Sequence, residues 1–148
     1  MEKLLISACM LGAATRYDGK SKCVLAPEIS ERLMQKYQLI PFCPEIYGGL
    51  STPRIPSERI GDRVMAADGR DVTENYMRGA EEALRMCHIF GIRLALLKAR
   101  SPACGKGEIY DGSFSGTLVP GNGVAAQLLC ENGIAIYSEA EAEQLLLL

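Results

Sequence analysis

An apolar run that stops abruptly before a serine and a cysteine constrains the fold of this chain more than any other stretch. Residues 92–97 are apolar except for Arg93, and the run has the length of a β-strand. Such a run is typical of a strand that is buried on both faces of a parallel sheet. Pro102 cannot donate to a strand ladder and Gly105 permits unusual backbone angles, so the chain must leave the sheet before Gly105. Cys104 is therefore predicted just past the carboxyl end of a strand, where ligands bind in open α/β sheets.

Two further cysteines follow apolar runs in the same way. Residues 3–8 end at Cys9, and residues 39–42, a weaker run because it contains Pro41, end at Cys43. Neighbouring parallel strands lie about 4.8 Å apart, so adjacent strand ends would bring the three thiols into a single pocket. Three thiols at one sheet edge are typical of a metal site.

Apolar periodicity and turn residues predict the remaining elements. We expect helices over residues 27–37, 73–90 and 124–131 and in a terminal segment after Ser138-Glu139, with Thr73 as the N-cap of the second. We also expect a strand over 134–137, and a β-hairpin or a β-turn extension over 63–72 centred on Asp68-Gly69. Alternating strands and helices predict a parallel sheet with helices on both faces and right-handed crossovers. We therefore predict an α/β fold, in which residues 1–148 form a single Rossmann-like three-layer domain with a mainly parallel sheet.

Composition excludes several classes of function. A formal net charge of −2 gives no long-range attraction for nucleic acid or an anionic membrane, so neither is expected as a partner. No apolar run approaches the roughly 20 residues of a membrane-spanning helix. The six cysteines are scattered through α/β periodicity, which predicts reduced thiols in a cytoplasmic protein. Cys87 is expected in the core and not as a ligand, and Cys23 and Cys130 are expected to be bystanders. His88 is the only histidine, so base chemistry is expected to come from a carboxylate.

Loops that leave the predicted strand ends are candidates for ligand contact. Arg16, Tyr17 and Asp18 lie in the loop after the first strand, and we expect them to contact a small substrate. Arg54 lies in an irregular loop rich in glycine and proline, where a solvated arginine is favoured over a contact with an anion or a cluster. The glycine-rich stretch 105–123 carries no nucleotide-binding fingerprint.

Five motifs, taken in order along nearly the whole chain, carry a resemblance to a known family. They are SACMLG (7–12), RYDG (16–19), CPEIYGGL (43–50), SPACG (101–105) and YDGSFSG (110–116). In these motifs the chain resembles the DUF523 family, which includes the thiouracil desulfurases. One departure is Thr15, where many relatives have a further cysteine, so a ligand role for that position is excluded here.

The resemblance implies a Rossmann-like domain that holds a [4Fe-4S] cluster by three cysteines, which fall on Cys9, Cys43 and Cys104. The family's catalytic glutamate and serine fall on Glu45 and Ser101. The implied reaction removes sulfur from a thiolated pyrimidine without redox chemistry and gives the oxo product and sulfide. An iron with an open position would act as a Lewis acid on the substrate sulfur, which a soft metal site prefers to oxygen.

The residues alone leave two other functions open. A zinc or cluster-bearing module could use the thiols to hold a structural metal and serve as a binding unit. A metal-free enzyme could use Cys9 or Cys104 as a nucleophile; the missing histidine partner counts against it, although a helix N-terminus can also lower a thiol pKa.

Overall fold

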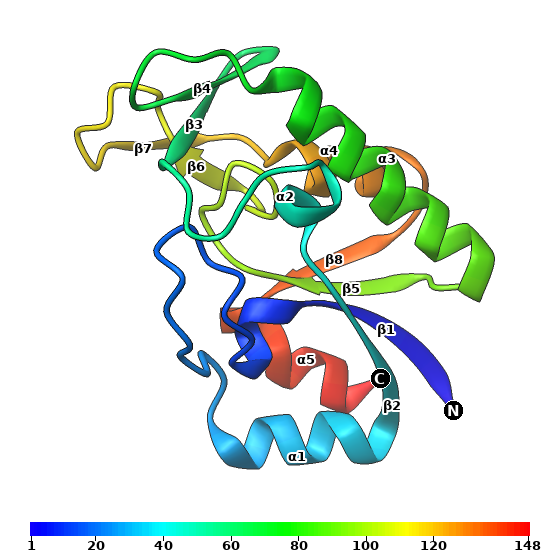
Figure 1. The fold of residues 1–148 in the computed structure, drawn as a ribbon. Helices are drawn as coiled ribbons and strands as arrows, with labels where there is room; N and C mark the ends of the chain where they lie inside the picture. Colours follow the sequence, from blue (N-terminus) through cyan, green and yellow to red (C-terminus); the bar gives the residue numbers. More distant parts are fainter.

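A four-stranded parallel sheet forms the centre of the structure, a computed structural model that describes residues 1–148 (Figure 1). Its strands are β1 (Glu2–Ser7), β2 (Tyr37–Phe42), β5 (Leu94–Leu97) and β8 (Ala135–Ser138). They are hydrogen-bonded in the order β2-β1-β5-β8, and all three pairs are parallel. The predicted α/β fold is confirmed, and the three apolar runs that precede cysteines are neighbouring strands.

Helices cover both faces of this sheet. They are α1 (Pro27–Lys36), α2 (Pro44–Tyr47), α3 (Thr73–Phe90), α4 (Val124–Glu131) and α5 (Ala142–Leu147), with short 3-10 helices η1 (Ala8–Leu11) and η2 (Glu139–Glu141). Helices α1 and α5 lie on one face, and α3 packs against α4 on the other (Figure 1). Successive residues of β1 alternate between the faces, because Leu4 and Ile6 join the core with Leu33 and Leu145 whereas Leu5 joins the core under α3. This two-sided burial explains why β1 is a continuous apolar run.

The position of β2 at one edge of the sheet explains how this strand contains a proline. Pro41 is exposed and lies opposite Ile6 of β1. Proline has no N–H to donate, so within sheets it is found on edge strands, where the missing donor faces away from the ladder. The apolar run interrupted by proline therefore still forms a strand.

Two short β-hairpins stand outside the main sheet. Their strands are β3 (Ser57–Ile60) and β4 (Arg63–Ala66), and β6 (Glu108–Tyr110) and β7 (Leu118–Pro120). The hairpin predicted over residues 63–72 is observed, since Met65 and Asp71 form an antiparallel bridge and the N–H of Val72 donates to the Val64 carbonyl at 2.9 Å. Strand β4 also pairs with β3, a partner that the prediction did not include. The hairpin β6–β7 lies inside the glycine-rich stretch, where three-residue strands leave too little alternation for the sequence to predict them.

Helix α3 covers the predicted residues but starts differently from the expectation. Thr73 is its first residue rather than its N-cap. The Thr73 hydroxyl accepts a hydrogen bond from the N–H of Val64 at 2.9 Å and donates to Asp71 Oδ1 at 2.5 Å, so it is used to join α3 to β4. Gly91, with a φ of 66°, ends the helix as predicted.

A glycine on the buried face of α3 lets α2 approach closely. A Cβ placed at Gly79 would lie 1.9 Å from the carbonyl oxygen of Pro44, and a Cβ at Gly48 would lie 2.0 Å from the α3 backbone. Glycine inside a helix costs about 0.5–1 kcal/mol relative to alanine, so the contact accounts for its presence here. Because Pro44 lies between Cys43 and Glu45, this contact sets the position of both side chains.

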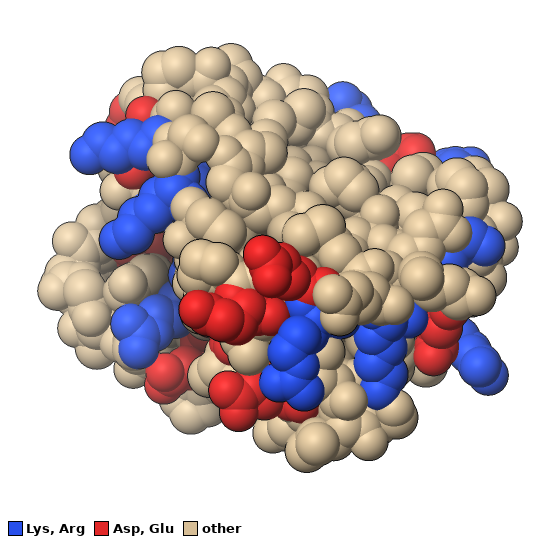
Figure 2. All heavy atoms as spheres, turned by 90° about the horizontal axis from the view of Figure 1, so that it is seen from below, with Lys and Arg blue, Asp and Glu red and all other residues tan.

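The charged surface is mixed in sign. Figure 2 shows Lys and Arg side chains interspersed with Asp and Glu on the face seen from below in Figure 1. Several exposed ion pairs join residues close in sequence, among them Arg70 with Asp68 and Arg85 with Glu82. None of the helices combines the length and the apolar character that crossing a membrane requires.

Replacing Gly79 by alanine is expected to lower the free energy of unfolding by about 1–3 kcal/mol, because the added methyl group must push α2 away from α3. Chemical denaturation measures the change. The control Glu81→Ala, at an exposed position of the same helix, should change stability by less than about 0.5 kcal/mol. A stabilised Gly79→Ala protein, the result that helix propensity alone predicts, would contradict the contact.

Candidate active site

A cavity of about 540 Å³ lies at the carboxyl edge of the sheet, where β1, β2 and β5 end. We call it the strand-end pocket. Its lining comes from parts of residues 7–17, 42–45, 54–58, 98–104 and the hairpin β6–β7, with Tyr76 of α3. Strand β1 pairs with β2 on one side and with β5 on the other. The pocket therefore occupies the crevice at which ligands bind in open α/β sheets.

The three strand-end cysteines all line the strand-end pocket. Cys9 lies in η1 directly after β1, Cys43 follows β2, and Cys104 lies in the turn after β5. Cys104 is buried, whereas the other two are half-buried, and all three are free thiols. The predicted convergence of these side chains on one pocket is therefore observed.

Burial and negative charge favour the protonated form of each of these thiols. Burial, followed by the charges of Glu45 and Cys43, raises the pKa of Cys9 to about 11. Burial and then Glu45 also raise the pKa of Cys43, and they raise that of Cys104 well above its usual value. The charges of Cys9 and Cys43 both raise the pKa of Cys104, so the three sulfur atoms lie within electrostatic reach of one another.

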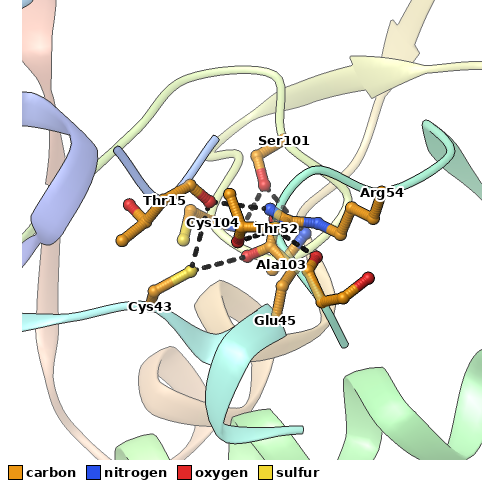
Figure 3. A network of polar contacts seen from close by, with 9 residues as sticks. Thr15, Cys43, Glu45, Thr52, Arg54, Ser101, Ala103 and Cys104 are labelled. Carbon is orange, nitrogen blue, oxygen red and sulfur yellow. Dashed lines mark hydrogen bonds and ion pairs between the residues drawn. The ribbon is translucent and has the colours of Figure 1, made fainter. Parts of the chain in front are cut away.

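A buried ion pair holds Glu45 in the pocket wall. Arg54 Nη2 donates to Glu45 Oε2 at 3.0 Å, and the two side chains are 8% and 13% exposed. The guanidinium also donates to the Thr15 carbonyl and to Thr52 Oγ1, both at 3.1 Å (Figure 3). The second oxygen, Oε1, lies 4.0 Å from Cys43 Sγ. One carboxylate oxygen is thus bound to Arg54, and the other faces the thiol.

The prediction that Arg54 is solvated is wrong. The backbone N–H of Arg54 donates to the carbonyl of Tyr17 at 2.8 Å, which ties the loop after α2 to the loop after β1. This contact carries the guanidinium inward beside Glu45. It joins segments far apart in sequence, so no periodicity or local motif could have indicated it.

Ser101 organises the turn that presents Cys104. Its Oγ accepts hydrogen bonds from the N–H groups of Ala103 at 3.0 Å and Cys104 at 3.1 Å (Figure 3). Arg100, with a φ of 68°, turns the chain out of β5, and the N–H of Gly105 donates to the Ser101 carbonyl at 2.9 Å. Since the Ser101 oxygen already accepts two hydrogen bonds, its O–H remains available as a donor.

The structure brings two of the three predicted substrate contacts to the pocket. Arg16 and Tyr17 belong to its lining, and Asp18 does not. The Asp18 carboxylate instead accepts the N–H of Lys20 at 3.0 Å and lies 3.8 Å from the Arg16 guanidinium. Asp18 therefore stabilises the loop turn, a common role for aspartate before glycine.

Other lining residues carry no sequence signal. Glu58 and Phe114 come from the two hairpins, and Tyr76 is spaced like a core residue of α3. Burial, followed by the charge of Glu45, raises the pKa of Tyr76 above its usual range. The three cysteines that were not expected in the site, Cys23, Cys87 and Cys130, lie outside the lining, and so does His88.

The three free thiols that line the pocket form a donor set that fits an iron–sulfur cluster. Thiolates on one tetrahedral ion bind at about 2.3 Å and so crowd together. In a [4Fe-4S] cluster each thiolate binds its own iron, which spreads the ligands around a larger centre. Three free thiols around one cavity match that donor set.

Comparisons with known proteins cover nearly the whole chain. The family model described as 2-thiouracil desulfurase matches residues 4–141. The chain is 38% identical to the uncharacterized protein YbbK of Bacillus subtilis (strain 168), with 97% of this chain and 99% of that protein covered. A solved structure described as a [4Fe-4S]-dependent thiouracil desulfidase, TudS (DUF523Vcz), is 46% identical with a TM-score of 0.93, covering 99% of this chain and 97% of that one. The chain therefore belongs to the 2-thiouracil desulfurase family.

Proposed function

We propose that this protein is an iron–sulfur enzyme that removes sulfur from a thiolated pyrimidine such as thiouracil and gives the oxo product and sulfide. The observation that carries the proposal is that Cys9, Cys43 and Cys104 line one pocket together with Glu45 and Ser101. Membership in the 2-thiouracil desulfurase family and the likeness to the desulfidase TudS support the same reaction.

Cys9, Cys43 and Cys104 are the residues that would hold the cluster. When bound by three thiolates, a [4Fe-4S] cluster supplies one iron with an open position, a soft Lewis acid suited to a thiocarbonyl sulfur. Lys98 and Arg16, whose positive charges lower the pKa of Cys9, would help this thiol to ionise. Six free cysteines suit a reducing compartment, so we infer that the protein acts in the cytoplasm.

We assign Glu45 as the general base. Its Oε2 is occupied by Arg54, so Oε1 is the oxygen available to take a proton from water. The water oxygen forms a bond to the ring carbon, the carbon–sulfur bond breaks, and the second water proton is lost as the C=O bond forms. The two protons leave with the sulfur as hydrogen sulfide, which returns Glu45 to its ionised form. Oxygen replaces sulfur at the same oxidation state of carbon, so the reaction needs no electron donor.

We assign Ser101 as a hydrogen-bond donor. Its oxygen already accepts two backbone N–H groups, which leaves the O–H to orient the substrate or to donate toward the departing sulfur. The same two hydrogen bonds fix Cys104. Ser101 therefore links the position of a cluster ligand to that of the substrate.

Two observations disfavour the other functions. In a metal-free enzyme, the raised pKa values of Cys9 and Cys104 would leave little thiolate for nucleophilic attack, and His88 does not line the pocket. In a purely structural site the ligand set is closed. Here the thiols open onto a cavity that also contains a carboxylate.

Anaerobic reconstitution is expected to load about four irons and four acid-labile sulfides per chain. Replacement of Cys9, Cys43 or Cys104 by alanine should abolish the cluster, as measured by iron and sulfide content and by absorption spectra. Cys130→Ala, at an exposed position outside the pocket, is the matched control and should load fully. Full iron content in Cys43→Ala would overturn the ligand assignment.

Glu45→Gln and Ser101→Ala are expected to retain the cluster and to release sulfide from 2-thiouracil about 10²–10⁴-fold more slowly, the usual cost of losing a proton-transfer group. Cluster content is measured on the same samples, since Ser101 also supports the Cys104 turn. If the loaded wild-type protein releases no sulfide from any thiolated pyrimidine, the proposed reaction is wrong. If Glu45→Gln and Ser101→Ala are as active as wild type, the roles assigned to Glu45 and Ser101 are wrong, whereas the proposed reaction stands.

Arg54→Ala is expected to lower the free energy of unfolding, because Glu45 would be left as an unpaired charge. Breaking a buried ion pair costs roughly 3–5 kcal/mol, and we expect a loss near the lower end of this range. Denaturant unfolding of the cluster-free protein measures the loss. Arg70→Ala, which removes a pair whose arginine is 65% exposed, should cost less than about 1 kcal/mol. Equal effects in the two variants would refute a special role for the buried pair.

A further inference from the structure

Phe114 occupies a position that its own backbone disfavours. It lies in the turn between β6 and β7 with a φ of 57°, in the left-handed region. Apart from Arg100 it is the only residue other than glycine with positive φ, and bulky side chains rarely adopt this conformation. Glycine or asparagine would relieve the strain. Strained residues of this kind cluster at sites of function, where the surrounding structure holds them in place.

The neighbouring hairpin holds Phe114 in this conformation. Glu58 Oε1, on β3, accepts the N–H of Gly112 at 2.9 Å and the N–H of Phe114 at 3.1 Å. A Cβ at Gly112 would lie 2.1 Å from Ile60, so the turn is also packed against β3. Within the turn, Asp111 Oδ1 accepts the N–H of Ser113 at 2.8 Å. The turn is therefore fixed by its contacts with β3 and by a hydrogen bond of its own.

The ring that this turn presents is not used for core packing. Phe114 is 40% exposed and lines the strand-end pocket. Tyr17 and Ile55, from two other loops, also line it and are 46% and 40% exposed. Together these three residues form an apolar rim on a pocket whose wall carries the charged side chains of Glu45 and Arg54.

We propose that Phe114 is a substrate-recognition residue whose ring packs against the flat ring of the thiolated base, and that Glu58 is the residue that positions it. This inference rests on the proposed function and adds a residue that selects for planar heteroaromatic substrates. Every nucleobase presents a π-face, and stacking on an aromatic side chain strengthens binding without requiring hydrogen bonds to the ring edge. The polar groups of the wall then remain free for the reacting carbon and sulfur.

The test compares Phe114→Asn with Phe114→Tyr. Asparagine tolerates positive φ but removes the ring, whereas tyrosine keeps the ring in the strained conformation. For the cluster-loaded protein we expect Phe114→Asn to raise KM for 2-thiouracil and Kd for uracil, measured by calorimetry, by about 5- to 100-fold, the range of base–aromatic stacking. The value of kcat should change less than about threefold, and Phe114→Tyr should bind like wild type. Phe90→Ala, at a residue that is 39% exposed and outside the pocket, is the matched control and should leave both constants unchanged.

Thermal unfolding separates recognition from packing. If Phe114 serves recognition, Phe114→Asn should melt at the wild-type temperature or above it, because strain is relieved while binding is lost. A lower melting temperature with unchanged KM and Kd would make Phe114 a packing residue and overturn the inference.

Glu58→Gln keeps an acceptor oxygen and is expected to bind uracil like wild type, whereas Glu58→Ala should lose affinity in parallel with Phe114→Asn. Equal affinity in Glu58→Ala and wild type would overturn the positioning role.

The proposed function and this inference fail differently. Wild-type protein that binds uracil through Phe114 but releases no sulfide from 2-thiouracil would overturn the reaction and keep the recognition role. Wild-type protein that desulfurates 2-thiouracil with a KM indifferent to Phe114→Asn would keep the reaction and overturn the recognition role. Binding of neither 2-thiouracil nor uracil by the loaded wild type would overturn the recognition role as well.

Discussion

Hydrogen bonding of β1 to both β2 and β5 is the constraint on which the candidate site depends. Parallel pairing places the carboxyl ends of all three strands at one edge, and each strand is followed by a cysteine, one position past the end of β2, two past β1 and seven past β5. In the observed order, the strand that precedes Cys9 lies between the strands that precede Cys43 and Cys104. The helices on the two faces bury the alternating side chains of β1 and so hold this order in place.

The pocket gathers several acidic groups around one carboxylate. Glu45 contributes to the raised pKa of each strand-end thiol and of Tyr76. A buried carboxylate among acidic groups is costly unless it is paired, and Arg54 supplies the pairing charge. The loop that contains Arg54 is thus a structural partner of the site, although it contains no strand or helix.

The sequence predicts what depends on local pattern. The buried strands were indicated by apolar runs, and the thiols by their place after those runs, so the fold class and the convergence of Cys9, Cys43 and Cys104 could both be predicted. The remaining features depend on contacts between distant segments. Three such features produce no periodicity in the sequence: the burial of Arg54, the approach of α2 to Gly79 and the strained backbone of Phe114. Each depends on a contact with a residue more than 30 positions away.

The family motifs and the pattern of apolar runs predict different parts of the site. The position of the cysteines after apolar runs indicates only three thiols near a carboxylate, whereas the family resemblance implies the cluster and the kind of substrate. The 110–116 motif shows the limit of both, because it matches the family in sequence, yet its geometry as a turn beside the pocket is visible only in the folded chain.

Pro41 hinders the addition of a fifth strand at the β2 edge of the sheet. An edge strand presents unpaired N–H and C=O groups that can recruit a strand from another molecule. Pro41 removes one donor from the exposed edge of β2, two residues before Cys43. A second chain cannot continue a regular ladder past that point. The proline therefore protects the strand that precedes Cys43 from edge-to-edge aggregation.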